Sequence, residues 1–205
     1  MLVAEKILLR RLGTLEYGPA CEAMREFTLK RDATTPDELW LLEHPPVYTL
    51  GLGADAAHGP RNAGGIPLLQ ADRGGEITYH GPGQVVLYTL VDLARRGIKV
   101  RNFVSMLEQS VVDLLDGRAR GNPQARGVYV DGAKVAALGI RVSRGCAYHG
   151  LALNVDMDLG PFAAIDPCGY PGLRVTQTKD LGFDFSVESA GKRLAENLIG
   201  MLENA

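Results

Sequence analysis

The chain has 205 residues, of which 46% are hydrophobic and 22% are charged, and this balance indicates one globular domain over residues 1–205 rather than a disordered or fibrous chain. Its formal net charge is -2, which excludes the global basic excess typical of nucleic-acid-binding proteins. The first residues lack the order of a secretory signal, and no apolar run approaches the roughly 20 residues of a membrane span. We therefore expect a cytoplasmic protein with no nucleic-acid or membrane partner.

The N-terminal half is predicted to mix strands and helices. Residues 7–12 favour a strand, and residues 17–31 have the three- and four-residue apolar spacing of an amphipathic helix. Four further apolar runs predict strands: 38–44, 47–51, 66–72 and 84–93. Helical spacing returns over residues 102–115, so a second long helix is expected there.

The C-terminal half contains the clearest hairpin signal of the chain. Asp131-Gly132 separates two β-rich runs within residues 127–142, and Asp-Gly supplies the positive φ angles that tight hairpin turns need. A second turn at residues 143–145 and a run over 146–159 complete a predicted three-strand antiparallel meander. The last element is a helix that begins after Ser186, a residue type that caps helix N-termini.

One of the three cysteines has an unusual setting. The odd number and the spacing argue against a disulfide framework and against a CxxC metal site, so we expect no metal. Cys21 and Cys146 fit ordinary buried positions. Cys168 instead lies between Pro167 and Gly169, on a stretch that forms neither helix nor regular strand, and such a thiol is a candidate nucleophile.

A cysteine nucleophile needs a base or a cation that favours its thiolate. His80 and His149 are candidates because each stands next to a glycine, where a ligand or the backbone can approach closely. The other two histidines, His44 and His58, are interpreted as surface or structural residues. Lys134 opens an apolar strand, and a lysine so placed can point into a pocket that favours its neutral, basic form.

The glycine-rich segment RGGEITYHGPGQ, residues 73–84, has no Walker A pattern and no dinucleotide fingerprint. What remains is a flexible backbone rich in N–H groups, suited to lining a narrow ligand channel or to binding a carbonyl oxygen. An irregular surface loop is the alternative interpretation.

These motifs together resemble the octanoyl-[acyl-carrier-protein]:protein octanoyltransferases, also called lipoate-protein ligase B. The resemblance rests on RGGEITYHGPGQ, GVYVDGAKVAALGIRV, HGLALN and PCG, which occur in family order, and it extends to LLEHPPVYTLG and GLRVTQTKDLG. It implies an α/β (α+β) fold of the biotin and lipoate ligase superfamily, with mixed and antiparallel sheets flanked by helices.

The resemblance also implies site residues and partners. Cys168 would accept the acyl group with Lys134 as its acid/base partner. Three segments would line the acyl site: Arg73, Gly74, Gly75, Glu76, Ile77, Thr78, Tyr79 and His80; Ala137, Leu138 and Gly139; and His149, Gly150, Leu151 and Ala152. The donor would be octanoylated acyl-carrier protein, and the acceptors would be lipoyl domains of 2-oxoacid dehydrogenase E2 subunits and the glycine cleavage H protein. No ATP, metal or other cofactor is expected.

A docking surface for the acidic carrier protein is a further possibility from charge alone. Two basic groups could supply it: Arg95, Arg96, Lys99 and Arg101, or Arg141 and Arg144. The alternative for either group is an ordinary solvated face.

Two other functions stay open at the level of the sequence. An ATP-dependent lipoate or biotin ligase would share the fold but would not need a cysteine, and transfer from an acyl thioester without ATP would separate the two. A non-catalytic lipoyl-domain binding module would keep the fold and form no acylated intermediate.

Overall fold

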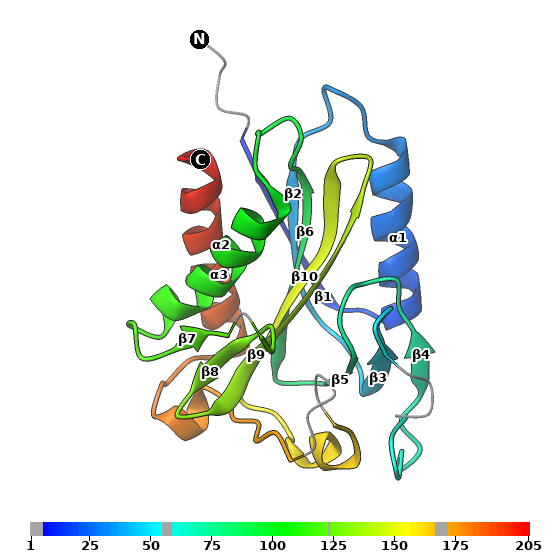
Figure 1. Cartoon of the computed structure of the whole chain (residues 1–205), viewed down its shortest axis with the longest axis vertical. Helices are drawn as coiled ribbons and strands as arrows, with labels where there is room; N and C mark the ends of the chain where they lie inside the picture. Colours follow the sequence, from blue (N-terminus) through cyan, green and yellow to red (C-terminus); the bar gives the residue numbers. More distant parts are fainter. Residues whose placement is uncertain (1–5, 55–58, 123, 167–171) are drawn as a thin grey trace.

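The computed structural model describes residues 6–54, 59–122, 124–166 and 172–205. They form a large twisted sheet with helices on both faces and a small sheet beside it (Figure 1). The helices are α1 (Tyr17–Lys30), α2 (Val100–Leu114) and α3 (Val187–Glu203), with short 3-10 turns at Gly160–Ala164 and Lys179–Leu181. The fold is therefore α+β with mixed sheets, which confirms the predicted class.

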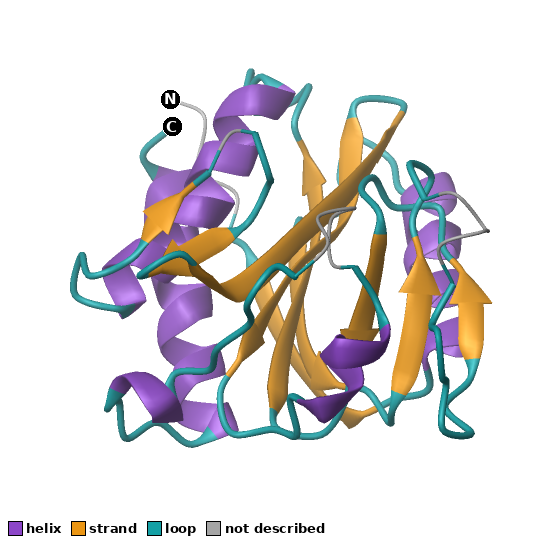
Figure 2. Cartoon of the chain, turned by 60° about the horizontal axis from the view of Figure 1, so that its bottom comes forward, coloured by secondary structure: helices purple, strands orange, loops and turns teal. Residues whose placement is uncertain are grey.

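The large sheet has seven strands in the order β1-β2-β6-β10-β9-β8-β7. Only β1 and β2 run parallel, and every other neighbouring pair is antiparallel. Its strands are β1 (Leu8–Thr14), β2 (Glu38–Glu43), β6 (Gln84–Asp92), β7 (Arg120–Gly121), β8 (Val128–Val130), β9 (Ala133–Ser143) and β10 (Cys146–Asn154). The small sheet has the order β4-β3-β5 and consists of β3 (Val47–Leu50), β4 (Leu68–Gln70) and β5 (Ile77–His80), and it lies beside the large sheet in Figure 2.

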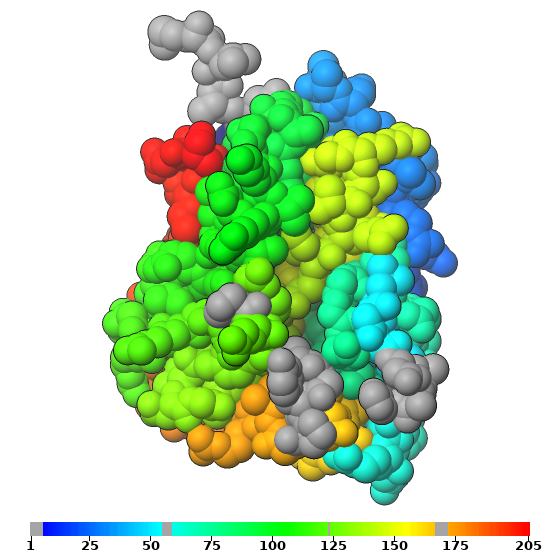
Figure 3. Space-filling model, in the orientation of Figure 1, coloured from blue at the N-terminus to red at the C-terminus, as the bar shows by residue number. Residues whose placement is uncertain are grey.

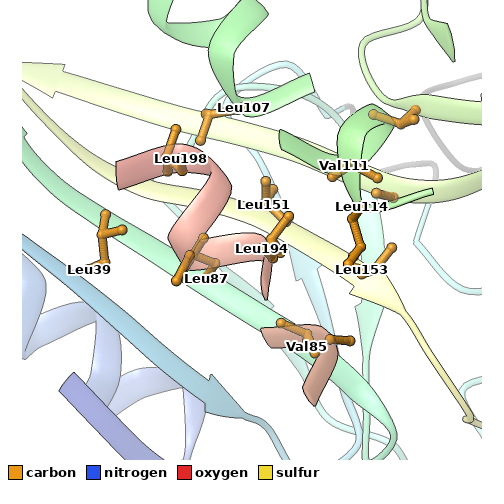
Figure 4. Close-up of a cluster of buried hydrophobic side chains, with 14 of the residues drawn as sticks. Leu39, Val85, Leu87, Leu107, Val111, Leu114, Leu151, Leu153, Leu194 and Leu198 are labelled. Atoms are coloured by element: carbon orange, nitrogen blue, oxygen red, sulfur yellow. The ribbon is translucent and has the colours of Figure 1, made fainter. Parts of the chain in front are cut away.

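The main core lies between the large sheet and helices α2 and α3. Alternate side chains of β6 and β10 point to this side because successive residues of a strand face opposite ways. Figure 4 shows Leu87 and Leu151 from the sheet against Leu194 and Leu198 from α3. The other face of the sheet packs against α1 through a second, smaller apolar cluster around Met24. One face is thus filled by large aliphatic side chains, and the other retains room for a site.

Several predicted elements are confirmed with small shifts of their ends. Asp131 and Gly132 have φ angles of 48° and 76°, as the predicted hairpin turn between β8 and β9 requires. The meander β8-β9-β10 is confirmed, and the Oγ of Ser186 accepts a hydrogen bond from Ser189 N at 3.1 Å, which confirms the predicted cap of α3. Among the described helices, none is long and apolar enough to cross a bilayer.

A buried carboxylate joins three segments of this fold. Asp37 is fully buried, and its two oxygens accept hydrogen bonds from Arg31 at 2.6 Å, Arg95 at 2.9 Å and Arg96 at 2.6 Å. Two of the arginines considered for a docking patch, Arg95 and Arg96, therefore hold α1, β2 and the end of β6 together. Burial alone raises the pKa of Asp37, but the bonds from Asp92 N, Arg31 and Arg96 outweigh it and hold that pKa below its ordinary value.

Removal of this carboxylate is expected to be strongly destabilising. In Asp37→Ala three guanidinium groups lose their shared anion in a buried setting, which costs about 3–5 kcal/mol of unfolding free energy. Urea unfolding followed by circular dichroism measures the loss. The matched control is Glu188→Ala, which breaks a pair with Arg11 that is exposed on both sides and removes one charge from the first turn of α3, and it should cost less than about 1 kcal/mol. An Asp37→Ala variant as stable as that control would contradict the assignment.

Candidate active site

A cavity of about 620 Å³ opens between the large sheet and the small sheet. Its floor is built from the face of β9 and β10 that lies away from α2 and α3, and its far wall is the segment 73–80. On the face shown in Figure 3, the yellow-green residues of β9 and β10 border the cyan and teal residues of the small sheet. The cavity volume lies within the range usual for small-molecule sites.

The floor is wide because two cross-strand pairs have almost no side chains. Gly139 pairs with Gly150 and Ala137 with Ala152, so small residues lie side by side on β9 and β10. A Cβ on Gly139 would lie 2.8 Å from the carbonyl oxygen of Gly74, and one on Gly150 would overlap the carbonyl oxygen of Leu87. Glycine is therefore required at both positions, because neighbouring backbone comes too close to leave room for a side chain.

Most of the expected acyl-site residues line this cavity. All of Ala137 to Gly139 and of His149 to Ala152 do so, and from the segment 73–80 all but Gly74 and Tyr79. Gly74 N instead donates to the carbonyl oxygen of Ile140 at 3.0 Å and fixes the segment to β9. Tyr79 turns to the opposite side, where its ring packs against Tyr48 and Phe162.

The glycine-rich segment is more ordered than its composition indicates. Its middle residues, Ile77–His80, form strand β5, which pairs with β3, and the side chain of its first residue, Arg73, is buried. The Arg73 guanidinium donates to the carbonyl oxygens of Gly74 and Glu76 at 3.0 Å, and to the carbonyl oxygen and Oγ1 of Thr49 at 2.9 and 2.7 Å. One buried guanidinium therefore satisfies several backbone carbonyls at the start of the segment and ties it to Thr49 of β3.

Lys134 lies at the end of the cavity where β9 begins. It is 3% exposed, its Nζ donates to the carbonyl oxygen of Arg126 at 3.2 Å, and it lies 5.2 Å from the ring centroid of Tyr129. Its backbone holds the chain that follows the PCG motif: Lys134 N donates to Arg174 O at 2.8 Å and Thr176 N donates to Lys134 O at 2.9 Å. The amine is therefore buried at the cavity and tied to that chain.

Cys168 lies outside the described residues, as do Pro167, Gly169 and His58. On the N-terminal side, Arg61 donates to both carboxylate oxygens of Asp166 at 3.2 Å. The two cysteines within the described residues are free thiols. Burial raises the pKa of Cys21 to about 11 and raises that of Cys146, so both thiols stay protonated at neutral pH and neither is an activated nucleophile.

His149 is held in a strained conformation at the edge of the cavity. Its φ is 61°, a left-handed value that costs a residue with a side chain about 1–2 kcal/mol. Its Nε2 lies 2.7 Å from Asp72 Oδ1, and its carbonyl oxygen accepts from Thr89 Oγ1 at 2.9 Å. Because a carboxylate only accepts, the neutral ring carries its proton on Nε2.

Sequence reasoning missed the polar residues that orient the histidines. Asp72 binds His149, Tyr88 binds His44, and Gln84 binds His80 at 2.7 Å. Gln84 closes the motif RGGEITYHGPGQ and Asn154 closes HGLALN, so both stood at the ends of recognised segments. A search for amide side chains near the candidate histidines would have found Gln84 and Asn154, but not Asp72 or Tyr88.

Three buried histidines should make stability depend on pH. Burial lowers the pKa of His44, His80 and His149, most strongly for His80, so the folded protein keeps them neutral below the unfolded value near 6.5. As pH falls below about 6.5, the unfolded chain binds up to three more protons than the folded chain. The unfolding free energy should therefore decrease with falling pH, by up to about 4 kcal/mol for each pH unit.

Urea unfolding at a series of pH values between about 7.5 and 5.5 measures that slope, because this range spans the histidine pKa of the unfolded chain. In His44→Gln, which keeps a donor for the Leu15 carbonyl, the slope should drop by about a third, since one of the three protons is removed. A stability that does not change over this window would contradict the neutral assignment.

Comparisons with known proteins agree with this geometry. Residues 17–199 match the family model of the lipoyl protein ligase A/B catalytic domain. The chain is 54% identical to an octanoyltransferase of Azoarcus sp. (strain BH72), over 98% of this chain and 89% of that protein. It is 57% identical to an octanoyltransferase of Thiobacillus denitrificans, over 94% of this chain and 89% of that protein.

A solved structure shares the fold at much lower sequence identity. A bi-partite lipoate protein ligase from Thermoplasma acidophilum, studied with its E2 lipoyl domain, superimposes with a TM-score of 0.76 at 18% identity. The match covers 96% of this chain and 84% of that one. This likeness shows a common architecture.

Proposed function

Because the chain belongs to the octanoyltransferases with a lipoyl protein ligase A/B catalytic domain, we propose that it moves an octanoyl group from octanoyl-acyl-carrier protein to a lysine of a lipoyl domain. Octanoyl transfer makes it an acyltransferase of lipoate biosynthesis. The donor, the acceptor domains and the covalent route are the parts we propose. Lipoyl domains of 2-oxoacid dehydrogenase E2 subunits and the glycine cleavage H protein are the acceptors.

The observation that carries the proposal is the cavity floor of Ala137, Gly139, Gly150 and Ala152, which leads toward buried Lys134. Such a floor suits an aliphatic chain, since each methylene that leaves water contributes about 0.8 kcal/mol. The amine at the end of the floor suits the acyl carbonyl, where protons must move.

In the first step, the Cys168 thiol gives its proton to Lys134 and the thiolate attacks the carbonyl carbon of the carrier thioester. A new carbon–sulfur bond forms, the bond to the carrier sulfur breaks, and Lys134 returns the proton to the leaving thiolate. One thioester replaces another, so this step needs no ATP. The chain after the PCG motif supports this pairing, because its Arg174 and Thr176 are hydrogen-bonded to the Lys134 backbone.

In the second step, the neutral amine of the acceptor lysine attacks the Cys168 thioester. The amide bond forms, the carbon–sulfur bond breaks, and Lys134 takes a proton from the amine and passes it to the Cys168 sulfur. A thioester becomes an amide, which runs downhill. Backbone N–H donors near the carbonyl would stabilise the oxyanion of both steps, and one such donor typically contributes about 3 kcal/mol.

The proposal is tested by mixing the protein with octanoyl-acyl-carrier protein and a lipoyl domain in the absence of ATP. We expect an octanoylated lipoyl domain, seen as a mass shift. The control replaces the thioester with octanoate plus ATP and should give no product. Product only in the second mixture would identify an ATP-dependent ligase, and product in neither would indicate a binding module.

A further inference from the structure

The hydrogen bonds that link Asn154, Gln84 and His80 in the cavity wall can be assigned in only one direction. The Asn154 Nδ2 donates to the carbonyl oxygen of Thr176 at 2.9 Å, so its Oδ1 faces the other way. Gln84 Nε2 donates to that Oδ1 at 2.9 Å and to the carbonyl oxygen of Tyr79 at 3.2 Å. Both amides are therefore fixed in orientation, and the atom that Gln84 presents to His80 is its oxygen.

The fixed amide decides where the neutral His80 ring carries its proton. The Nδ1 of His80 lies 2.7 Å from Gln84 Oε1, which can only accept, so Nδ1 must donate. The ring is neutral because burial lowers its pKa well below the ordinary value. Nε2 is then left with a lone pair and no proton.

The His80 ring, whose Nε2 carries this lone pair, is part of the cavity wall. His80 lines the cavity and is 6% exposed, and Tyr17 stacks on its ring at 5.8 Å with an interplanar angle of 16°. Across the described part of the chain, no side-chain or backbone group donates to Nε2 of His80. The Nε2 atom also keeps accessible surface, so this acceptor is open to a donor that a ligand brings into the cavity.

A plain octanoyl chain has no such donor, because it consists of methylene and methyl groups beyond its carbonyl. We propose that His80 Nε2, oriented by Gln84 and Asn154, is a built acceptor for a second class of substrate: eight-carbon acyl chains that carry a hydroxyl group. This inference rests on the proposed function. It makes His80 a specificity-determining residue and Gln84 and Asn154 positioning residues.

The acceptor itself can be tested in the free protein, without any transfer reaction. Nitrogen-15 NMR of histidine-labelled protein should show His80 protonated on Nδ1, whereas His149 should be protonated on Nε2. In Gln84→Met the Nδ1 preference of His80 should be lost. Gln109→Met, on the exposed side of α2, is the matched control and should leave all histidine signals in place. A His80 ring protonated on Nε2 in the unaltered protein would overturn the proposal.

The substrate class is tested with carrier proteins that bear octanoyl, 6-hydroxyoctanoyl, 7-hydroxyoctanoyl or 8-hydroxyoctanoyl chains. For the best hydroxylated chain, the ratio of its kcat/KM to that of octanoyl should fall about five- to tenfold in His80→Phe, since one hydrogen bond is lost and the ring volume is kept. Circular dichroism establishes that the variant is folded. A ratio that is unchanged for all three positions would overturn the proposal.

Failure of the proposed function would look different. If the unaltered protein transfers no octanoyl group, the proposed function fails. Calorimetry then gives the dissociation constants of free hydroxyoctanoic and octanoic acids, and their ratio replaces the ratio of kcat/KM values. A preference for a hydroxylated acid that His80→Phe removes would support the acceptor in that case as well. Equal ratios in both proteins would refute it.

Discussion

Cys168→Ala is expected to lower the rate of octanoyl transfer by at least about 10⁴-fold, because the variant has no sulfur to carry the acyl group. The formation of octanoylated lipoyl domain from octanoyl-acyl-carrier protein measures the loss. Little residual rate should remain, since the thioester intermediate cannot form without its nucleophile.

Cys21→Ala and Cys146→Ala are the matched controls. Burial raises the pKa of both thiols, so neither is ionised at neutral pH, and both variants should transfer at nearly the normal rate. Normal activity in Cys168→Ala, or its loss in Cys146→Ala, would move the nucleophile to another residue.

Lys134→Met is expected to lower the rate of acyl transfer about 10²–10⁴-fold at neutral pH, the range typical for the loss of a general acid or base. Methionine retains an apolar stem against Tyr129 but cannot take a proton. The rate of the variant should recover partly toward pH 8.5, where a cysteine thiol ionises without help. Single-turnover acylation measured from pH 6 to 9 tests both points.

Lys134→Arg separates charge from proton transfer. Arginine keeps the positive charge but stays protonated at all accessible pH values, so it should not restore the rate if Lys134 acts as a base. A Lys134→Met variant with a normal rate at pH 7 would exclude the proposed role, and full activity in Lys134→Arg would reduce that role to electrostatic support.

The features that the sequence predicted well depend on neighbouring residues. The Asp131-Gly132 turn and the Ser186 cap each follow from the backbone preferences of one or two residues, and both occur as expected. The helix over 17–31 and the meander followed from apolar spacing in the same way.

The contacts that could not be predicted from the sequence depend on how segments far apart in the chain pair with one another. Gly139 meets Gly150 only because β9 and β10 pair in one of several possible registers. Asp72 reaches His149 and Gln84 reaches Asn154 across 77 and 70 residues of chain. No local pattern marks such partners, and the buried pairing of Asp37 with three arginines was hidden for the same reason.

The resemblance supplied what local reasoning did not. From the residues alone, Cys168 was one plausible nucleophile and Lys134 one plausible base among several candidates. The family motifs selected these two, and the described structure places Lys134 buried at the cavity, hydrogen-bonded through its backbone to Arg174 and Thr176.

The covalent step is tested most directly by mass spectrometry after the protein is mixed with octanoyl-acyl-carrier protein and no acceptor. We predict one octanoyl group per chain, located on the peptide that contains Cys168 and discharged when a lipoyl domain is added. An octanoyl group on Cys146 or Lys134, or transfer that proceeds with no adduct on Cys168 at any time, would contradict this mechanism.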